Sequence, residues 1–160
     1  MIPATASLQI GKIDMPVEVR QSQAGQDLNI ELLAHGQVLE TESYKVTDKA
    51  FLLAHAAGEH YKDPLPLLKF PMKVGDTWNW VGTMTAGDAP HKAQAVVSTT
   101  SESILLPTAG ATETVLVVVD LSIAGGGPTP AKRRMRFWFA KNMGLVKRQF
   151  GDASSREPAK

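Results

Sequence analysis

Apolar and polar residues alternate through most of the chain, and this period of two predicts β-strands. Leu28, Ile30 and Leu32 alternate with Asn29 and Glu31, which places the apolar side chains on one face of a strand. Residues 112–123 carry apolar side chains on both faces, as is typical of a strand that is covered on both sides. Turn-forming sequences separate the strands. The pattern predicts an antiparallel meander of about ten strands with hairpin loops.

The segment 47–58 has two interpretations. Thr47 is a suitable N-cap, residues 49–57 are mostly good helix formers, and Gly58 is a suitable helix end. Residues 50–55 can equally form a strand, because three consecutive apolar residues at 51–53 do not distinguish a strand from a helix.

A proline-rich stretch interrupts the strand pattern. Pro64, Pro66 and Pro71 lack backbone donors, which disfavours a helix or a central strand. Leu67 and Phe70 in the same stretch still need to be buried. We therefore expect an extended arm that packs against the open side of a curved sheet.

The arm leads into a turn and a tryptophan-containing strand. Val74-Gly75-Asp76 has the composition of a tight turn. Trp78 and Trp80 follow at a spacing of two, so they share one face of the next strand.

Size and composition indicate a single domain with an ordinary hydrophobic core. The chain has 160 residues, a formal net charge of +1 and no cysteine, which excludes a disulfide framework and cysteine-ligated metal sites. We expect one β domain over residues 1–152 and a polar tail over residues 153–160. The near-zero charge gives no drive toward nucleic acid, and no apolar run approaches the length of a membrane-spanning helix.

The localisation stays open at this stage. The first residues lack the basic region and apolar core of a signal peptide. The protein is therefore cytoplasmic, or else periplasmic or secreted if a leader has been removed.

Three motifs occur in a familiar order. They are Leu67-Leu68-Lys69-Phe70-Pro71 with Val74-Gly75-Asp76-Thr77-Trp78, then Leu106-Pro107-Thr108-Ala109-Gly110, then Phe137-Trp138-Phe139-Ala140 with Gly144-Leu145-Val146-Lys147. The chain resembles, over residues 40–150, a group of uncharacterised and often exported bacterial proteins with the pattern "fPlkvGdtW", "paG", "Wfa.gvGlvk". That group is similar to lipoprotein-carrier-like half-barrels.

This resemblance has three implications. It implies an all-β fold with a strongly curved antiparallel sheet, an open half-barrel. It favours the strand for residues 50–55, and it implies no catalytic residues. The chain has Asn142-Met143 where the pattern usually has "gv" before the glycine.

The residues capable of chemistry form no diagnostic motif. His55 and His60 with Glu59 are candidate metal ligands, but a spacing of five puts two residues of one strand on opposite faces. The serines at 98, 101 and 103 near Glu102 lack a nucleophile elbow. We expect no metal site, no cofactor and no enzymatic activity, with an enzyme of dispersed catalytic residues as an alternative.

A basic strand is the candidate interaction surface. Period two places Lys132, Arg134, Arg136 and Trp138 on one face. This face could bind an acidic partner or an anionic head group, or its arginines could pair with carboxylates on neighbouring strands.

The concave face of the sheet is the candidate ligand site. Its apolar residues could hold a lipid-like ligand or could simply close the core; they are Trp78, Trp80, Met84, Phe137, Phe139, Leu67 and Phe70. We expect a non-enzymatic binding or structural module of the bacterial envelope. The alternative is a protein–protein interaction module that uses residues 132–138 or a sheet edge.

Overall fold

The structure, a computed structural model, describes residues 4–10, 13–87, 89–106, 109–125, 128–141, 144–150 and 154–158. These residues form twelve β-strands. In chain order they are β1 (Ala4–Ile10), β2 (Ile13–Ala24), β3 (Asp27–Ala34), β4 (Gln37–Val46), β5 (Ala50–Ala56), β6 (Glu59–Lys69), β7 (Thr77–Ala86), β8 (Ala89–Leu106), β9 (Gly110–Ile123), β10 (Ala131–Ala140), β11 (Gly144–Phe150) and β12 (Ser154–Pro158).

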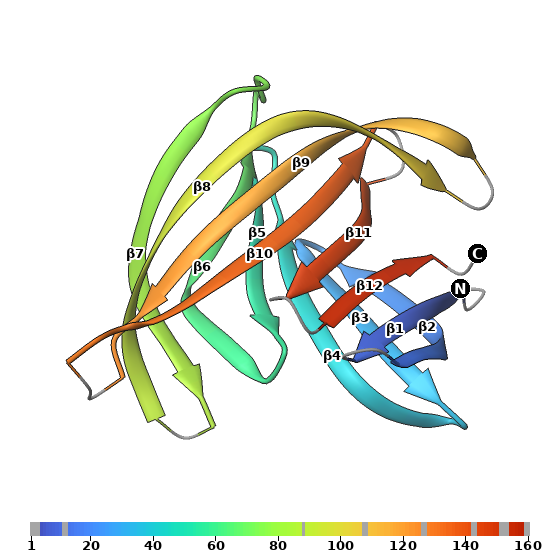
Figure 1. The fold of residues 1–160 in the computed structure, drawn as a ribbon, viewed down its shortest axis with the longest axis horizontal. Coiled ribbons are helices and arrows are strands. Elements are labelled where there is room, and N and C mark those ends of the chain that lie inside the picture. The colour runs from blue at the N-terminus through green and yellow to red at the C-terminus, as the bar shows by residue number, and fades with distance from the viewer. Residues whose placement is uncertain are drawn as a thin grey trace.

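The strands form one strongly curved antiparallel meander, which confirms the predicted fold class (Figure 1). Each strand from β2 to β11 pairs with its sequence neighbours. The β1–β12 ladder completes a ring of strands, whereas the sheet was predicted as an open half-barrel. The ladders differ greatly in length. The long β8–β9 hairpin is paired from Ala93–Ile123 to Leu106–Gly110, whereas β6 and β7 separate after three residue pairs. The ring is therefore loosely joined at that point.

The ambiguous segment is a strand, as the resemblance favoured. β5 pairs with β4 and with β6. Thr47, the candidate helix cap, instead accepts hydrogen bonds at Oγ1 from the backbone N–H groups of Lys49 and Ala50 (3.1 and 3.0 Å). This local turn starts the strand, and the buried positions of β5 require the sheet rather than a helix.

The proline-rich segment corrects one prediction. It is not a separate extended arm, because residues 59–69 form strand β6, which pairs with β5 at residues 59–60 and again, after an irregularity, over residues 65–69. Its leucines are buried as predicted, with Leu65 and Leu67 fully inaccessible. Beyond Tyr61, β6 has no ladder to β7. Pro64 and Pro66 lack a backbone N–H group, but they interrupt no ladder on the side of β6 that faces β7, so proline is tolerated there.

The end of the chain corrects one prediction. Residues 154–158, predicted to lie in a polar tail, form the short strand β12, which pairs with β1 and β11. Gly144, in the loop before β11, has a φ of 77°, which glycine adopts without a steric penalty. Asn142 and Met143 lie outside the described residues.

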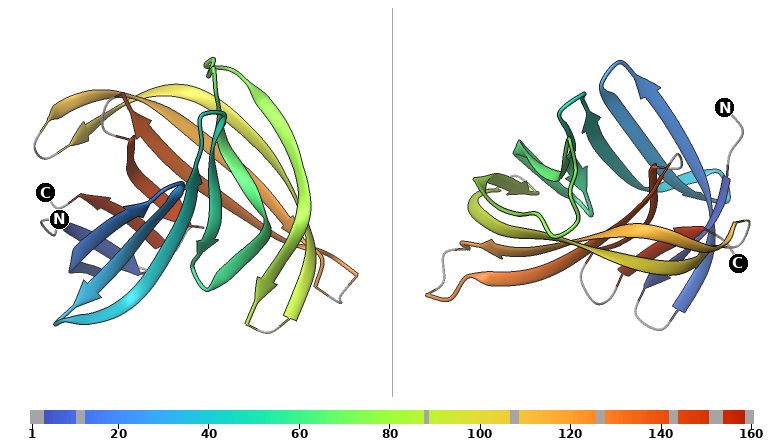
Figure 2. Two further views of the ribbon diagram at one scale, coloured as in Figure 1. Left: turned by 180° about the vertical axis from the view of Figure 1, so that it is seen from behind. Right: turned by 90° about the horizontal axis from the view of Figure 1, so that it is seen from above.

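The core lies inside the ring of strands, whose curvature Figure 2 shows. Two opposite parts of the sheet, here called its two walls, meet there: β4 and β5 on one side and β10 on the other. Phe51 of β5 contacts Phe139 of β10 edge to face, with ring centroids 5.0 Å apart, and Tyr44 of β4 packs on Phe51 at 5.4 Å. Strands β3 to β11 contribute residues to this core, largely at alternate positions, as the sequence pattern predicted. The interior therefore consists largely of packed apolar side chains.

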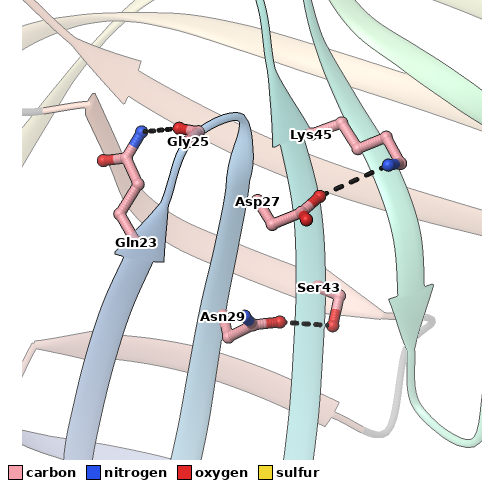
Figure 3. A network of polar contacts seen from close by, with 6 residues as sticks. All are labelled: Gln23, Gly25, Asp27, Asn29, Ser43 and Lys45. Atoms are coloured by element: carbon pink, nitrogen blue, oxygen red, sulfur yellow. Dashed lines mark hydrogen bonds and ion pairs between the residues drawn. The ribbon is translucent and has the colours of Figure 1, made fainter.

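Polar pairs mark the outer face of β3 and β4 (Figure 3). Ser43 Oγ donates to Asn29 Oδ1 at 2.9 Å, and Lys45 Nζ donates to Asp27 Oδ1 at 3.3 Å. Both pairs join residues that lie directly opposite each other.

No helix in the described part of the chain is long and apolar enough to cross a membrane.

Two leucines test whether β6 belongs to the core. Leu65→Ala removes a fully buried side chain and is expected to lower the free energy of unfolding by about 2–5 kcal/mol, measured by urea denaturation. Leu105→Ala is the matched control: Leu105 is 76% exposed, and we expect a change within about 0.5 kcal/mol. Equal effects of the two substitutions would contradict the placement of β6.

Candidate functional site

The candidate site is the seam between β6 and β7, defined as the stretch where residues 62–69 run beside residues 77–83 without a ladder. The only residue pairs of this ladder are Glu59–Ala86, His60–Thr85 and Tyr61–Met84. Beyond them the two strands diverge, while β7 remains fully paired with β8 on its other side. The seam is thus a stretch of two neighbouring strands along which no backbone ladder is formed.

Two tryptophan side chains bridge the seam. Trp78 Nε1 donates to the carbonyl oxygen of Pro66 at 3.0 Å, and Trp80 Nε1 donates to that of Asp63 at 3.2 Å. The Asp63 carboxylate accepts a third bond from the backbone N–H of Thr83 at 3.2 Å. Side-chain hydrogen bonds thus satisfy part of the backbone that a ladder would otherwise satisfy.

Gly82 makes room for this arrangement. A Cβ atom at Gly82 would lie 2.4 Å from Cζ2 of Trp80 and 3.0 Å from Cβ of Asp63. The indole ring therefore lies over the glycine of its own strand while its N–H group reaches β6. A side chain at position 82 would push the ring away from Asp63.

The seam is also packed on its inner side. Tyr61 and Trp80 contact each other edge to face at 5.9 Å. Lys69 Nζ lies 5.2 Å from the ring centroid of Trp78.

The turn between β6 and β7 is anchored to β8, because Gly75 N donates to Thr99 Oγ1 at 3.1 Å and Thr99 Oγ1 donates to the Asp76 carbonyl at 2.9 Å. The predicted turn at 74–76 is confirmed.

Most of the predicted ligand-lining residues come together in the core. Trp80, Met84, Phe137, Phe139 and Leu67 are buried in one cluster, and Trp78 packs against it. Phe70 lies outside that cluster and is 42% exposed. The structure thus groups six of the seven predicted residues, and they contact other core side chains.

A buried ion pair joins β11 to β4 across the interior. Arg148 donates from Nε and Nη2 to the two carboxylate oxygens of Glu42, at 2.9 and 3.2 Å, and Tyr44 donates its hydroxyl to Glu42 Oε1 at 2.6 Å. Glu42 is completely buried and Arg148 is 7% exposed. The bidentate geometry and the tyrosine bond compensate for the desolvation of both charges.

A second pair repeats this arrangement between β6 and β10. Arg133 bonds to Glu59, and Tyr61 lies two residues after Glu59, just as Tyr44 lies two residues after Glu42. The Tyr61 hydroxyl is 3.9 Å from the sulfur of Met135. Each Glu-X-Tyr segment therefore places a carboxylate and a phenol on the inner face, opposite an arginine.

Burial controls the ionisation of these groups. It raises the pKa of Tyr44 well above its usual value of 10.0, and the negative charge of Glu42 raises it further. Burial likewise raises the pKa of Tyr61, with Glu59 adding to the effect. Burial alone would lower the pKa of Arg148, but Glu42 raises it and the net shift is upward.

The predicted interaction strand makes contacts along its outer face. Arg134 bonds to Asp120 at 2.7 Å, and Arg136 donates to Gln149 at 3.1 Å. Trp138 is 5% exposed, in a second small cluster with Leu106 and Val146. Its indole donates to Glu102 at 3.2 Å, and Lys147 Nζ lies 4.7 Å from its ring centroid. Period two placed these residues on one face correctly.

The prediction that His55 and His60 lie on opposite faces was wrong. The β5–β6 hairpin turns between them, so they lie directly opposite each other on neighbouring strands. The described residues contain no group of three or more histidines and acidic residues placed to hold a metal ion.

The shallow hollows lie elsewhere, on the outer face of β7 to β10. One is formed around Asn79, Val81 and Val96, and another extends to Pro128 and Pro130. Val81 is 76% exposed at their junction. These hollows belong to the outer surface, and Trp80 is the one predicted concave-site residue in their described lining.

Sequence reasoning missed the two interior ion pairs. Alternation does place Arg133 on the same face as Met135 and Phe137, and Arg148 on the same face as Phe150. That signal identifies an inward-facing arginine. The glutamate partners lie far away in the chain, and only the curvature of the sheet selects them.

Comparison with solved structures identifies a protein of similar fold. The hypothetical lipoprotein YmcC from Escherichia coli K12 superimposes with a TM-score of 0.50 over 97% of this chain and 87% of that chain, at 11% sequence identity. At this identity the match establishes a shared all-β fold. No family model and no curated protein matches the sequence.

Glycine 82 provides a test of the seam. Gly82→Ala is expected to displace the Trp80 ring and to lower the free energy of unfolding by about 1–3 kcal/mol, because it overpacks a filled site. Gly125→Ala is the control, since a Cβ there meets nothing within 4 Å. Urea denaturation followed by tryptophan fluorescence measures both. A Gly82→Ala protein as stable as the control would show that the indole does not occupy this position.

The two tyrosines of the chain, Tyr44 and Tyr61, report directly on the interior. Both pKa values are raised in the folded protein, so tyrosinate absorbance should not appear near pH 10 until the protein unfolds. Above pH 10 the unfolded chain loses these protons first. The free energy of unfolding should then fall by up to about 1.4 kcal/mol per pH unit for each tyrosine. Ionisation of the folded protein at the ordinary pKa would refute the placement of both phenols, and Tyr44→Phe should halve the signal on unfolding.

Proposed function

We propose that this protein is a non-catalytic binding module of the bacterial envelope that holds an apolar, acyl-chain-like ligand between the two walls of its ring. The envelope assignment is supported by the fold shared with a protein described as a hypothetical lipoprotein. The ligand class is supported by the residues of the inner face, which are apolar apart from mutually neutralised pairs.

The observation that carries the proposal is the seam. On its other side β7 is paired with β8 along its whole length. By contrast, β6 and β7 share three residue pairs and then rely on two indole hydrogen bonds. Each such bond contributes only about 0.5–1.5 kcal/mol. Opening the seam therefore costs far less than opening a full ladder, and it exposes Trp80 and Met84 without unfolding the sheet.

The inner polar groups favour holding a ligand over catalysing a reaction. The Glu42 carboxylate accepts hydrogen bonds from both Arg148 and Tyr44, so its negative charge is paired with the positive charge of Arg148. A proton donor or nucleophile in this cluster would first have to break a bidentate ion pair. The cluster of Glu42, Tyr44 and Arg148 therefore has a structural role, because it joins β4 to β11 across the interior.

The basic strand offers a weaker basis for the alternative interaction module. Arg134 and Arg136 bond to Asp120 and Gln149, and Trp138 is covered. A protein partner would have to compete with these contacts, so the apolar interior is the preferred site.

The three tryptophans of the chain provide a matched experiment. Trp78→Phe and Trp80→Phe each keep an aromatic ring but delete the N–H group that bridges the seam. We expect each to increase the association rate of N-phenyl-1-naphthylamine by roughly 2- to 12-fold, the range that corresponds to one hydrogen bond. Stopped-flow fluorescence measures the rate. Trp138→Phe is the control, because its N–H group bonds to Glu102 outside the seam.

Native mass spectrometry completes the test. Protein purified from a bacterial envelope fraction is expected to carry a non-covalent apolar adduct that organic extraction removes. If the wild-type protein binds neither the dye nor any adduct, the proposed function is wrong. If binding occurs but all three substitutions act alike, the seam is not the entrance.

A further inference from the structure

The β5–β6 hairpin brings two histidines together. Its turn consists of Ala57 and Gly58, with φ values of 53° and 76°, as a two-residue hairpin turn requires. The turn sets the pairs Ala56–Glu59 and His55–His60. Two residues five apart in sequence are thereby directly opposite on neighbouring strands.

Both imidazoles lie on the outer face. Glu59 and Tyr61 are buried on the inner face at 7% and 1% exposure, so His60 between them points outward. His60 is exposed and His55 is half-buried. Their ring centroids are 6.2 Å apart, with the planes inclined by 42°.

This separation suits a shared metal ion. A metal–nitrogen bond of about 2.0–2.1 Å puts each ring centre roughly 3.2 Å from the ion. Two imidazoles on one ion then have centres roughly 4.5 Å apart at a right angle and about 6.3 Å apart when opposed. The observed 6.2 Å falls within this range, and rotation of the exposed His60 side chain adjusts it without moving the backbone.

We propose that His55 and His60 form a surface site for a divalent transition-metal ion, with copper(II) bound most tightly among the biological divalent ions. Imidazole suits copper, nickel and zinc, and copper(II) leads this series for a nitrogen site. The flanking cross-strand positions are Ser43 and Thr85, both uncharged. Because no third histidine or acidic residue joins the group among the described residues, water completes the coordination. The ion links β5 to β6 beside the start of the seam.

Titration with copper(II) sulfate tests the site. The wild-type protein is expected to bind one ion, with a rise in melting temperature that saturates and a paramagnetic resonance spectrum showing coordinated nitrogen. His55→Asn and His60→Asn should each weaken binding by at least about tenfold, because each removes one of two imidazoles.

The remaining two histidines are the controls. His91 is held by the Ala124 carbonyl at 3.1 Å, and His35 has a φ of 53°, a conformation that asparagine accepts. His91→Asn and His35→Asn should leave copper binding unchanged. If His60→Asn binds copper as well as the wild type, or if the controls lose binding equally, the proposed site does not exist. The outcome is independent of the apolar ligand, which concerns the opposite face.

Discussion

The connection between β6 and β7 depends on contacts between two tryptophan side chains and the neighbouring backbone. Where β6 leaves β7, the indole N–H groups of Trp78 and Trp80 reach the carbonyls of Pro66 and Asp63. Prolines can occupy β6 because no ladder is needed there, and Gly82 leaves space for the ring. The same features make this seam weaker than the ladders around it. The short β6–β7 ladder and the proposed ligand entrance therefore have one physical origin.

The interior combines apolar packing with two arginine–glutamate pairs. Buried pairs of this kind are weak contributors to net stability, but breaking one by removing a partner is costly. Arg148 and Glu42 join β11 to β4, and Arg133 and Glu59 join β10 to β6. Each pair thus connects strands that are not neighbours in the sheet. These connections hold opposite parts of the sheet together across the interior.

The turn between β5 and β6 decides on which face of the sheet the two histidines lie. If residues 55 and 60 belonged to a single strand, their side chains would point to opposite faces. The turn at Ala57 and Gly58 folds the chain between them and places both on the outer face. Alanine with a positive φ is uncommon, so composition offered little indication of this turn. The face of the sheet that carries potential metal chemistry is consequently the face away from the core.

The all-β class, the alternation of faces and the burial of Trp80, Met84 and Phe137 followed from the sequence, because the period of two assigns each residue to a side of its strand. The identity of β5 needed the resemblance as well, since three adjacent apolar residues fit either element. Tertiary structure alone decided that the proline-rich segment is a strand, that residues 154–158 join the ring, and that Glu42 meets Arg148. These features depend on the curvature of the sheet and on which strands meet across it. Both arise from the sum of many contacts distant in sequence, which local patterns do not contain.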